Sequence, residues 1–244
     1  MSQPTQIAMW SGPRNISTAM MRSFEARGDC EVVDEPFYAA YLAASGAEHP
    51  LRDAVLASQA TEPAAVVDGL GRPLADGRTL QYQKQMAHHM VFAIDEAWLG
   101  TVRHAFLVRD PAAMIASYLT MRTSVVADDL GLARQREIYE SVVARTGQTP
   151  PVVDAADVLR DPPAVLAELC TSLDVAYSPA MQAWPPGRRP SDGVWAPHWY
   201  AAVERSTGFA PYVEREAKLP PAALRVLADC EPDYRFFFDR RIGA

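Results

Sequence analysis

Cysteines are scarce in this 244-residue sequence, and their spacing is unlike that of a metal site or a disulfide framework. The three cysteines, Cys30, Cys170 and Cys230, are odd in number and far apart, and no CxxC motif occurs. We therefore expect no bound metal and no disulfide, and interpret the cysteines as idle thiols in a reducing compartment.

Long apolar runs and a surplus of positive charge are also missing. No stretch approaches 18 apolar residues, and residues 1–6 contain no basic segment leading into an apolar one. We therefore expect no membrane span and no signal peptide, and take the cytoplasm as the default location. The formal net charge of −7 disfavours a general nucleic-acid binder, which usually carries a basic surplus. The negative net charge does not exclude a small anionic ligand, because a few local Arg residues and a helix N-terminus suffice to hold one.

Short apolar segments alternate with helical segments along most of the chain. Strands are expected at residues 7–10, 31–34, 79–86, 104–108 and 152–154, and helices at 17–28, 37–44, 112–122, 131–146 and 162–173. This alternation predicts an α/β fold of three layers, with a central, mainly parallel sheet flanked by helices on both faces. Residues 51–78 mix Ala-rich helical sequence with Gly and Pro and give no clear prediction.

The last third of the chain has a different character. After about residue 176, prolines and tryptophans replace the strand–helix alternation, and a helix rich in core residues is expected at 221–238. The length and the 49% hydrophobic content suit one sizeable core. We therefore expect a single domain over residues 1–244, with its core at about 7–175 and a loop-rich region and helix at about 176–244.

A short polar segment with an arginine follows the first expected strand: Ser11-Gly12-Pro13-Arg14-Asn15-Ile16-Ser17-Thr18. Ligands of open parallel sheets bind beyond the carboxyl ends of the strands. A loop there directs backbone N–H groups at a phosphate, the following helix N-terminus adds partial positive charge, and Arg14 adds a full charge. Ser17 or Thr18 is expected to cap that helix. The Walker A pattern with its Lys is absent, so the prediction is a phosphate loop of another kind; the alternative is an ordinary turn with an exposed Arg.

A second arginine, Arg109, ends the fourth expected strand. Asp110 and Pro111 after it suit the N-cap and first position of a helix, and Ser117 lies two helical turns further on. Arg109 and Ser117 are therefore candidates to hold a second phosphate at the same sheet edge. The alternative is a surface Arg and a Ser that packs between helices.

Together the two segments resemble those of the sulfotransferases that use 3′-phosphoadenosine 5′-phosphosulfate (PAPS). In that family a PRSGTS or PKSGTT loop holds the 5′-phosphosulfate, and an RDPxxxxxSxxxxR element holds the 3′-phosphate. The first pattern is matched at Pro13, Arg14 and Ser17 or Thr18, but Asn15-Ile16 replaces Ser-Gly. The second is matched at Arg109-Asp110-Pro111 and Ser117, and Arg122 falls where the trailing Arg belongs.

The resemblance implies a P-loop-like fold, PAPS as co-substrate and transfer of a sulfuryl group to a hydroxyl or amine of a small-molecule acceptor. It implies that the residues contacting PAPS are Gly12, Pro13, Arg14, Asn15, Ile16, Ser17, Thr18, Arg109 and Ser117. Arg14 would also stabilise charge during transfer. Ile16 stands where the family has the Gly that lets the backbone pass close to a phosphate, which leaves the path of this loop open.

Transfer also requires a base that accepts the proton of the acceptor. Glu35 directly follows the second expected strand, where several members of the family place a catalytic Glu. His88 and His89 follow the third strand, where others place a catalytic His, and Lys84 is a candidate to reach the sulfuryl group. The alternative for Glu35 is an acid at a helix start. For the histidines it is one core and one surface side chain, because neighbours in a regular element cannot both face one site.

A late segment echoes the family's RKGxxGxW element, which closes over the 3′-phosphate and adenine. Arg188, Arg189, Gly193 and Trp195 match it in part. The segment is a candidate lid, and a plain packed loop is the alternative; His198 is equally ambiguous. Residues 35–78, with Tyr38 and Tyr41, and Tyr82 beyond them, favour a small or apolar-faced acceptor.

Two other functions stay open at this point. A P-loop kinase would need a loop Lys and a carboxylate for Mg²⁺ at a strand end, whereas this loop carries Arg14. A non-catalytic nucleotide-binding relative is favoured by the missing loop Gly. The oligomeric state is not predicted.

Overall fold

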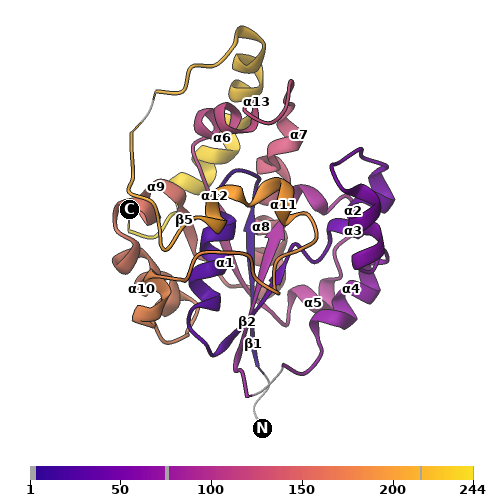
Figure 1. Ribbon diagram of the computed structural model, residues 1–244, viewed down its shortest axis with the longest axis vertical. Helices are drawn as coiled ribbons and strands as arrows, with labels where there is room; N and C mark the ends of the chain where they lie inside the picture. The colour runs from indigo at the N-terminus through magenta and orange to yellow at the C-terminus, as the bar shows by residue number, and fades with distance from the viewer. Residues whose placement is uncertain (1–3, 75–76, 215, 244) are drawn as a thin grey trace.

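A computed structural model describes residues 4–74, 77–214 and 216–243. Within them, five parallel strands form one sheet in the order β2-β3-β1-β4-β5 (Figure 1). The strands are β1 (Thr5–Ser11), β2 (Cys30–Asp34), β3 (Leu80–Met86), β4 (Arg103–Val108) and β5 (Val152–Asp154). The predicted α/β fold with a parallel central sheet is confirmed, and each expected strand is present.

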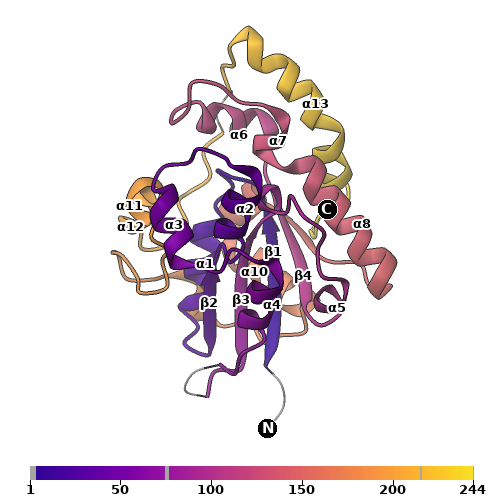
Figure 2. The same cartoon turned by 90° about the vertical axis from the view of Figure 1, so that its right-hand side faces the viewer.

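Helices cover both faces of the sheet. One face packs against α1 (Ser17–Glu25), α9 (Ala155–Arg160) and α10 (Pro162–Ser172). The other packs against α4 (Pro63–Leu70), α5 (Glu96–Leu99), α6 (Pro111–Tyr118), α7 (Ala127–Leu130), α8 (Leu132–Thr146) and α13 (Pro221–Phe238). Figure 2 shows α8 and α13 together on one side of the sheet.

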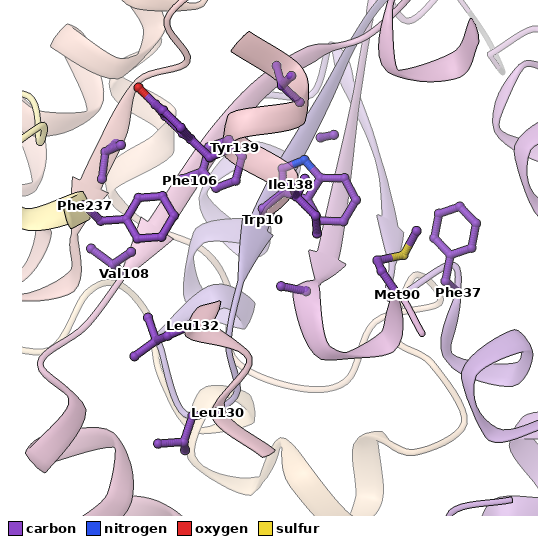
Figure 3. Packing of buried hydrophobic residues seen from close by; sticks show 14 of the residues in the cluster. Trp10, Phe37, Met90, Phe106, Val108, Leu130, Leu132, Ile138, Tyr139 and Phe237 are labelled. Carbon is purple, nitrogen blue, oxygen red and sulfur yellow. The ribbon is translucent and has the colours of Figure 1, made fainter. Parts of the chain in front are cut away.

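Alternate residues of each strand enter the two cores, as the two-residue period of a strand requires. Met9 and Leu107 point to the core under α1, whereas Trp10 and Phe106 point to the core under α8 and α13. In Figure 3, Trp10 and Phe106 lie near Ile138, Tyr139 and Phe237 of the covering helices. These side chains are fully or almost fully buried, and burying each contributes about 1.5–3 kcal/mol.

The polar residues of β3 are buried too, although the alternating pattern of residues 79–86 is typical of a half-exposed strand. All seven residues of β3 are buried. Hydrogen bonds between the side-chain amides satisfy the polar groups: Gln83 Nε2 donates to Gln81 Oε1 at 2.8 Å, and Gln85 Nε2 donates to Gln83 Oε1 at 3.1 Å. The amides therefore satisfy one another, which makes their burial tolerable.

Helix ends differ from the predictions at several positions. The helix expected at 17–28, α1, ends at Glu25. The N-cap of α1 is Ile16, without a side-chain hydrogen bond, rather than Ser17 or Thr18. The helix expected to reach residue 122 ends at Tyr118. Its start is confirmed, because Asp110 caps α6 by accepting from Ala113 N at 2.8 Å, with Pro111 at the first position.

The ambiguous residues 51–78 form α3 (Arg52–Ser58) and α4, as far as the structure describes them. The expected helix at 37–44 is α2 (Tyr38–Ser45). The loop-rich region holds the 3₁₀ turn η2 (Pro179–Gln182) and two short helices, α11 (Ala196–Trp199) and α12 (Ala201–Glu204). Another 3₁₀ turn, η1 (Ala87–His89), follows β3. Nothing helical among the described residues combines the length and apolar character that crossing a bilayer needs.

A third cluster of buried residues joins distant parts of the chain. Tyr38 and Leu42 of α2 and Val55 of α3 pack against Trp195 and Tyr200 of the late segment. The orange segment with α11 and α12 crosses in front of the sheet in Figure 1. This packing brings residues near position 200 to the carboxyl end of the sheet.

Candidate active site

The carboxyl ends of the central strands meet at one edge. Ser11 at the end of β1 is in register with Met86 of β3 and Leu107 of β4, and Asp34 at the end of β2 is in register with Lys84. A cavity of about 380 Å³ opens at this edge. Its walls include Pro13 to Ala19, Glu35, Tyr38, His49, Lys84, Met86, His88, His89, Arg109, Ser117, Tyr118, Arg122, Leu159, Trp199, Tyr200, Ala202, Val203, Ser206 and Gly208 to Ala210.

The loop after β1 has left-handed backbone conformations at two non-glycine residues. Arg14 has φ 59° and Ile16 has φ 49°. Alternating right- and left-handed residues make the backbone concavity in which N–H groups converge on an anion. Ile16, which stands where the resembled loop has Gly, thus adopts a left-handed conformation at a cost of about 1–2 kcal/mol for an L-residue.

Buried amides fix this loop to the sheet. Asn15 is 1% exposed, and its Nδ2 donates to the carbonyl of Leu107 at 2.7 Å. Gln135 of α8, also buried, donates from Nε2 to the carbonyls of Trp10 at 3.1 Å and Leu107 at 3.0 Å. The two amides tie the ends of β1 and β4 together, so the loop is held from beneath.

Gly12 lies outside the cavity wall, unlike the other loop residues that the resemblance assigns to the nucleotide. A Cβ atom at this position would lie 2.3 Å from the carbonyl oxygen of Leu130. Gly12 is thus required because the loop packs closely against the end of α7 and leaves no room for a side chain.

The two arginines lie together, and Arg14 also contacts Ser117. Arg14 Nε donates to Ser117 Oγ at 2.9 Å, and Arg109 Nη1 donates to the carbonyl oxygen of Arg14 at 2.6 Å. Burial lowers the pKa of both guanidinium groups, and the charge of Arg14 lowers the pKa of Arg109 further. Neither forms an ion pair with a carboxylate in the described part of the chain. Two positive groups without a carboxylate partner make this end of the cavity suited to an anion.

The opposite end of the cavity holds a buried ionic cluster. Lys84 is 2% exposed, and its Nζ lies 3.0 Å from Asp34 Oδ1, 2.7 Å from Glu35 Oε1 and 2.5 Å from Tyr200 Oη. Tyr200 Oη also donates to Asp34 at 2.8 Å, and Trp195 Nε1 donates to Tyr200 Oη at 3.1 Å. Lys84 is thus already engaged on three sides.

Burial and charge shift the titration of this cluster. Burial opposes the charged form of Lys84, but Asp34 and Glu35 outweigh it, so the pKa of Lys84 lies above its usual value. Burial raises the pKa of Glu35, and the nearby charge of Lys84 offsets only part of that rise. Glu35 also has φ 43°, although it precedes Pro36 and bears a side chain. A carboxyl with a raised pKa in a strained position is a candidate base.

His88 and His89, both named as candidates, line the cavity, so the alternative of one core and one surface side chain does not hold. They lie in the 3₁₀ turn η1 rather than in a regular strand or helix, and their rings meet edge to face, 4.4 Å apart. Burial lowers the pKa of His88 to about 3 and that of His89 well below its usual range. Both rings are therefore neutral near pH 7.

The aromatic side chains of α2 surround His89. Tyr38 and Tyr41 both stack on its ring, with centroids 4.6 and 4.9 Å away. Tyr82 instead stacks on Phe24 in the core beneath α1. Of the three tyrosines that favoured an apolar-faced acceptor, Tyr38 alone is among the residues that line the cavity.

The residues of the late segment that line the cavity follow the partial RKGxxGxW match in the sequence. Arg188, Arg189 and Trp195 are not among the lining residues, whereas Trp199 and Tyr200 are. Asp192 instead forms a buried ion pair with Arg22 of α1, 2.6 Å apart, and Gly193 N donates to Asp34 Oδ2 at 3.0 Å. The matched residues therefore anchor the segment, and the residues after them cover the cavity. His198 packs edge to face on Trp199.

Several site residues were not predicted from the sequence. Asp34 was detectable, since it ends a strand beside Glu35. Tyr200 and Gln135 carried no signal, because their contacts join residues 166 and 125 positions apart. In the described residues, no group of three or more His, Cys, Asp or Glu side chains is arranged to hold a metal ion.

Known proteins resemble this chain in sequence and in fold. Two proteins of Arabidopsis thaliana, branched-chain-amino-acid aminotransferase-like proteins 1 and 2, are 36% and 32% identical over 86% and 93% of the chain. The chain spans 37% and 40% of their lengths. The sulfotransferase domain of the Synechococcus PCC 7002 olefin synthase has the same fold, with a TM-score of 0.50 and 18% identity over 94% of this chain and 95% of that one.

The model of one protein family, described as "Sulfotransferase domain", matches residues 5–234. That range contains the strand-end loop, both arginines and the Lys84 cluster. The sequence resemblance carried by the two arginine segments is thus confirmed, and the chain belongs to the sulfotransferase domain family.

Proposed function

We propose that this sulfotransferase takes its sulfuryl group from PAPS and transfers it to a hydroxyl or amine of a small-molecule acceptor. One observation carries the proposal: Arg14, Ser117 and Arg109 form a connected anion site at one end of a cavity whose other end holds Glu35. A nucleotide with anions at two positions needs two cationic contacts, and an acceptor needs a base facing it.

The nucleotide contacts follow from the strand-end geometry. The loop Pro13 to Thr18, at the N-terminus of α1, would hold the 5′-phosphosulfate with backbone N–H groups and Arg14. Arg109 and Ser117 would hold the 3′-phosphate. The acceptor atom attacks sulfur, the bond from sulfur to the bridging phosphate oxygen breaks, and Arg14 stabilises the charge that grows on that oxygen. The products are the sulfated acceptor and 3′-phosphoadenosine 5′-phosphate.

Glu35 is the base that the geometry supports best. The proton released by the acceptor passes to its carboxylate, and the raised pKa of Glu35 increases its affinity for that proton. His88 and His89 are weaker candidates, because a ring whose pKa lies far below 7 binds a proton poorly. Lys84 would act as a positioning residue that fixes the Glu35 carboxylate by its 2.7 Å contact.

A kinase-type reaction is less well supported. The carboxylates at the end of β2 that could hold Mg²⁺ are both bound to Lys84, at 3.0 and 2.7 Å. A divalent ion there would have to displace the ammonium group or accept its repulsion. The loop also offers Arg14 where a P-loop kinase has Lys.

The test is thermal stabilisation by 3′-phosphoadenosine 5′-phosphate, AMP, and ATP with Mg²⁺. A ligand at 100 times its Kd stabilises by about 2.7 kcal/mol, which corresponds to a Tm rise of about 5–10 °C for a domain of this size. We expect the bisphosphate to stabilise most. Arg109→Ala should abolish its advantage over AMP, whereas Arg225→Ala on the exposed side of α13 should not. Equal stabilisation of the wild type by AMP and the bisphosphate would refute the role of Arg109.

Radiolabelled PAPS then tests turnover directly. Transfer of label to a panel of small hydroxyl and amine acceptors supports the proposal. Tight binding of the bisphosphate without transfer to any acceptor would instead support the non-catalytic alternative.

A further inference from the structure

Arg122 lines the cavity without a partner for its charge. It follows the end of α6, and its guanidinium carbon lies 5.9 Å from the centroid of the Trp199 ring. Its Nε is buried and makes no hydrogen bond. No carboxylate in residues 4–74, 77–214 or 216–243 lies within ion-pair distance of it. A buried N–H of a cation without an acceptor is costly, so this position favours an anionic ligand.

The surroundings of Arg122 differ from those of the other two cavity arginines. Arg109 donates a hydrogen bond to the carbonyl oxygen of Arg14, and Arg14 donates one to Ser117. Arg122 instead lies near side chains at the Glu35 end. Burial is the main cause that raises the pKa of Tyr38, Tyr41 and Tyr118 and lowers that of His49, and the charge of Arg122 opposes the rise and adds to the fall. Arg122 falls where the family's element for the 3′-phosphate has its trailing Arg. Its contact with Trp199, the residue before Tyr200, brings it instead toward the Glu35 end of the cavity, because Tyr200 Oη lies 3.5 Å from Glu35 Oε1.

Tyr38 connects Arg122 to the candidate base. The pKa of Tyr38 is affected by the charges of both Glu35 and Arg122. Tyr38 stacks on His89, whose Nε2 lies 3.9 Å from Glu35 Oε2. The cavity wall near both charged groups is therefore aromatic, with Tyr118 and Trp199 as further lining side chains. Such a wall suits a flat ring.

Asp129 is the acidic group in the same neighbourhood. It raises the pKa of Tyr41 and Tyr118, so it shares their surroundings with Arg122. Its Oδ2 accepts from Val126 N at 2.9 Å, at the start of α7. Asp129 thus serves the loop backbone and leaves the guanidinium of Arg122 available to a ligand.

We propose that the acceptor is a small aromatic molecule bearing a carboxylate, whose anion binds Arg122 while its hydroxyl or amine faces Glu35. The inference rests on the proposed sulfotransferase function and specifies its acceptor class. It assigns Arg122 to acceptor specificity and removes it from the nucleotide site.

The test compares hydroxy acids with their neutral amides. The probes are 4-hydroxybenzoate, 4-hydroxyphenylacetate, 4-hydroxyphenylpropanoate and the three corresponding amides. The proteins are the wild type, Arg122→Met, which keeps the apolar stem, and Arg225→Met as an exposed control. Two readouts are taken: label transfer from PAPS, and calorimetric binding of each probe to protein saturated with 3′-phosphoadenosine 5′-phosphate, which needs no turnover.

We expect the wild type and the control to prefer at least one acid over its amide by about ten- to hundredfold, the effect of a charge-assisted contact. Arg122→Met should abolish that preference and leave the Kd of the bisphosphate within about threefold of wild type, well short of the effect of losing a phosphate contact. Acids that bind no better than amides would overturn the inference. So would a tenfold or greater loss of bisphosphate affinity in Arg122→Met, which would return Arg122 to the nucleotide. Failure of the wild type to bind the bisphosphate would refute the proposed function itself. The binding measurement detects this failure without any acceptor, so the two outcomes can be told apart.

Discussion

Backbone strain is concentrated at the residues to which we assign chemistry. Among the described residues, the non-glycine residues with positive φ are Arg14, Ile16, Glu35, Leu51 and Asp174, and the first three line the cavity. Each such conformation costs of order 1–3 kcal/mol and persists only where surrounding contacts enforce it. Asn15 and Gln135 supply those contacts for the loop, and the hydrogen bond from Glu35 N to the carbonyl of Lys84, at 3.0 Å, supplies one for Glu35.

Glu35 gives a prediction at this scale. Glu35→Gln keeps the shape of the side chain and removes the base, so we expect kcat to fall about 10²–10⁴-fold. In the wild type, activity should decline as the pH falls through the raised pKa of Glu35, because the base must be ionised. Steady-state kinetics over pH measures both effects, with Glu168→Gln, on the exposed side of α10, as control.

The same substitution tests the raised pKa through stability. Because the folded pKa is raised, Glu35 contributes stability that is present below its unfolded pKa, near 4.5, and is lost as the pH rises through the folded value. Gln does not titrate, so Glu35→Gln should match the wild type at acidic pH and be the more stable protein at pH 8. The quantity to compare is the free energy of unfolding of the variant minus that of the wild type. If this difference is smaller at pH 8 than at pH 4.5, the direction of the pKa shift is contradicted.

At the scale of elements, the segment that covers the cavity is attached by a few buried contacts. Arg22 of α1 is 1% exposed and pairs with the fully buried side chain of Asp192. Gly193, next to it, donates to Asp34 and has no room for a Cβ, which would lie 2.2 Å from the Trp195 ring. These contacts fix the start of the segment that carries Tyr200 into the Lys84 cluster.

Asp192→Asn should therefore affect both stability and activity. It leaves the charge of Arg22 buried without its main partner, which costs about 3–5 kcal/mol when such a pair is broken. Urea unfolding measures the loss, and Asp53→Asn, whose side chain is fully exposed, should change stability by less than about 0.5 kcal/mol. If Asp192→Asn also changes the free energy of unfolding by less than about 0.5 kcal/mol, the ion pair does not hold the segment.

At the scale of the whole molecule, residues late in the sequence pack against elements formed early in it. Phe237 of α13 stacks on Phe106 of β4, 5.6 Å away, so the C-terminal helix completes the core over the central sheet. Trp195 and Tyr200 complete another cluster with α2 and α3. We propose on this basis that residues 1–244 fold as one domain, with no independent unit after residue 176.

One cooperative unfolding transition is the consequence. Far-ultraviolet circular dichroism and tryptophan fluorescence should give coincident thermal midpoints, because Trp10 lies in the sheet and Trp184, Trp195 and Trp199 lie in the late segment. The bisphosphate should shift both midpoints equally. Two separated transitions would indicate that the late segment unfolds on its own.

The fold and half of the site were predictable from local sequence. Period-two apolar strands, the Asp110–Pro111 helix start and the arginines after two strands are short-range patterns, and short-range sterics and capping determine them. The resemblance added the proposal that PAPS is the nucleotide bound by these arginines. Glu35 was found for the same reason, since it directly follows a strand.

The remaining half was decided by tertiary structure. No local rule shows that Tyr200 lies 2.5 Å from Lys84, that two adjacent histidines face one cavity, or that Arg122 lines the same cavity as Tyr38. Local preference also favoured the wrong cap for α1, because buried amides force Ile16 into a conformation that its own side chain disfavours. The sequence alone determined the parallel sheet and the placement of Arg14 and Arg109 at the ends of its strands. Long-range packing, in which burial outweighs local preference, determined which other side chains line the cavity.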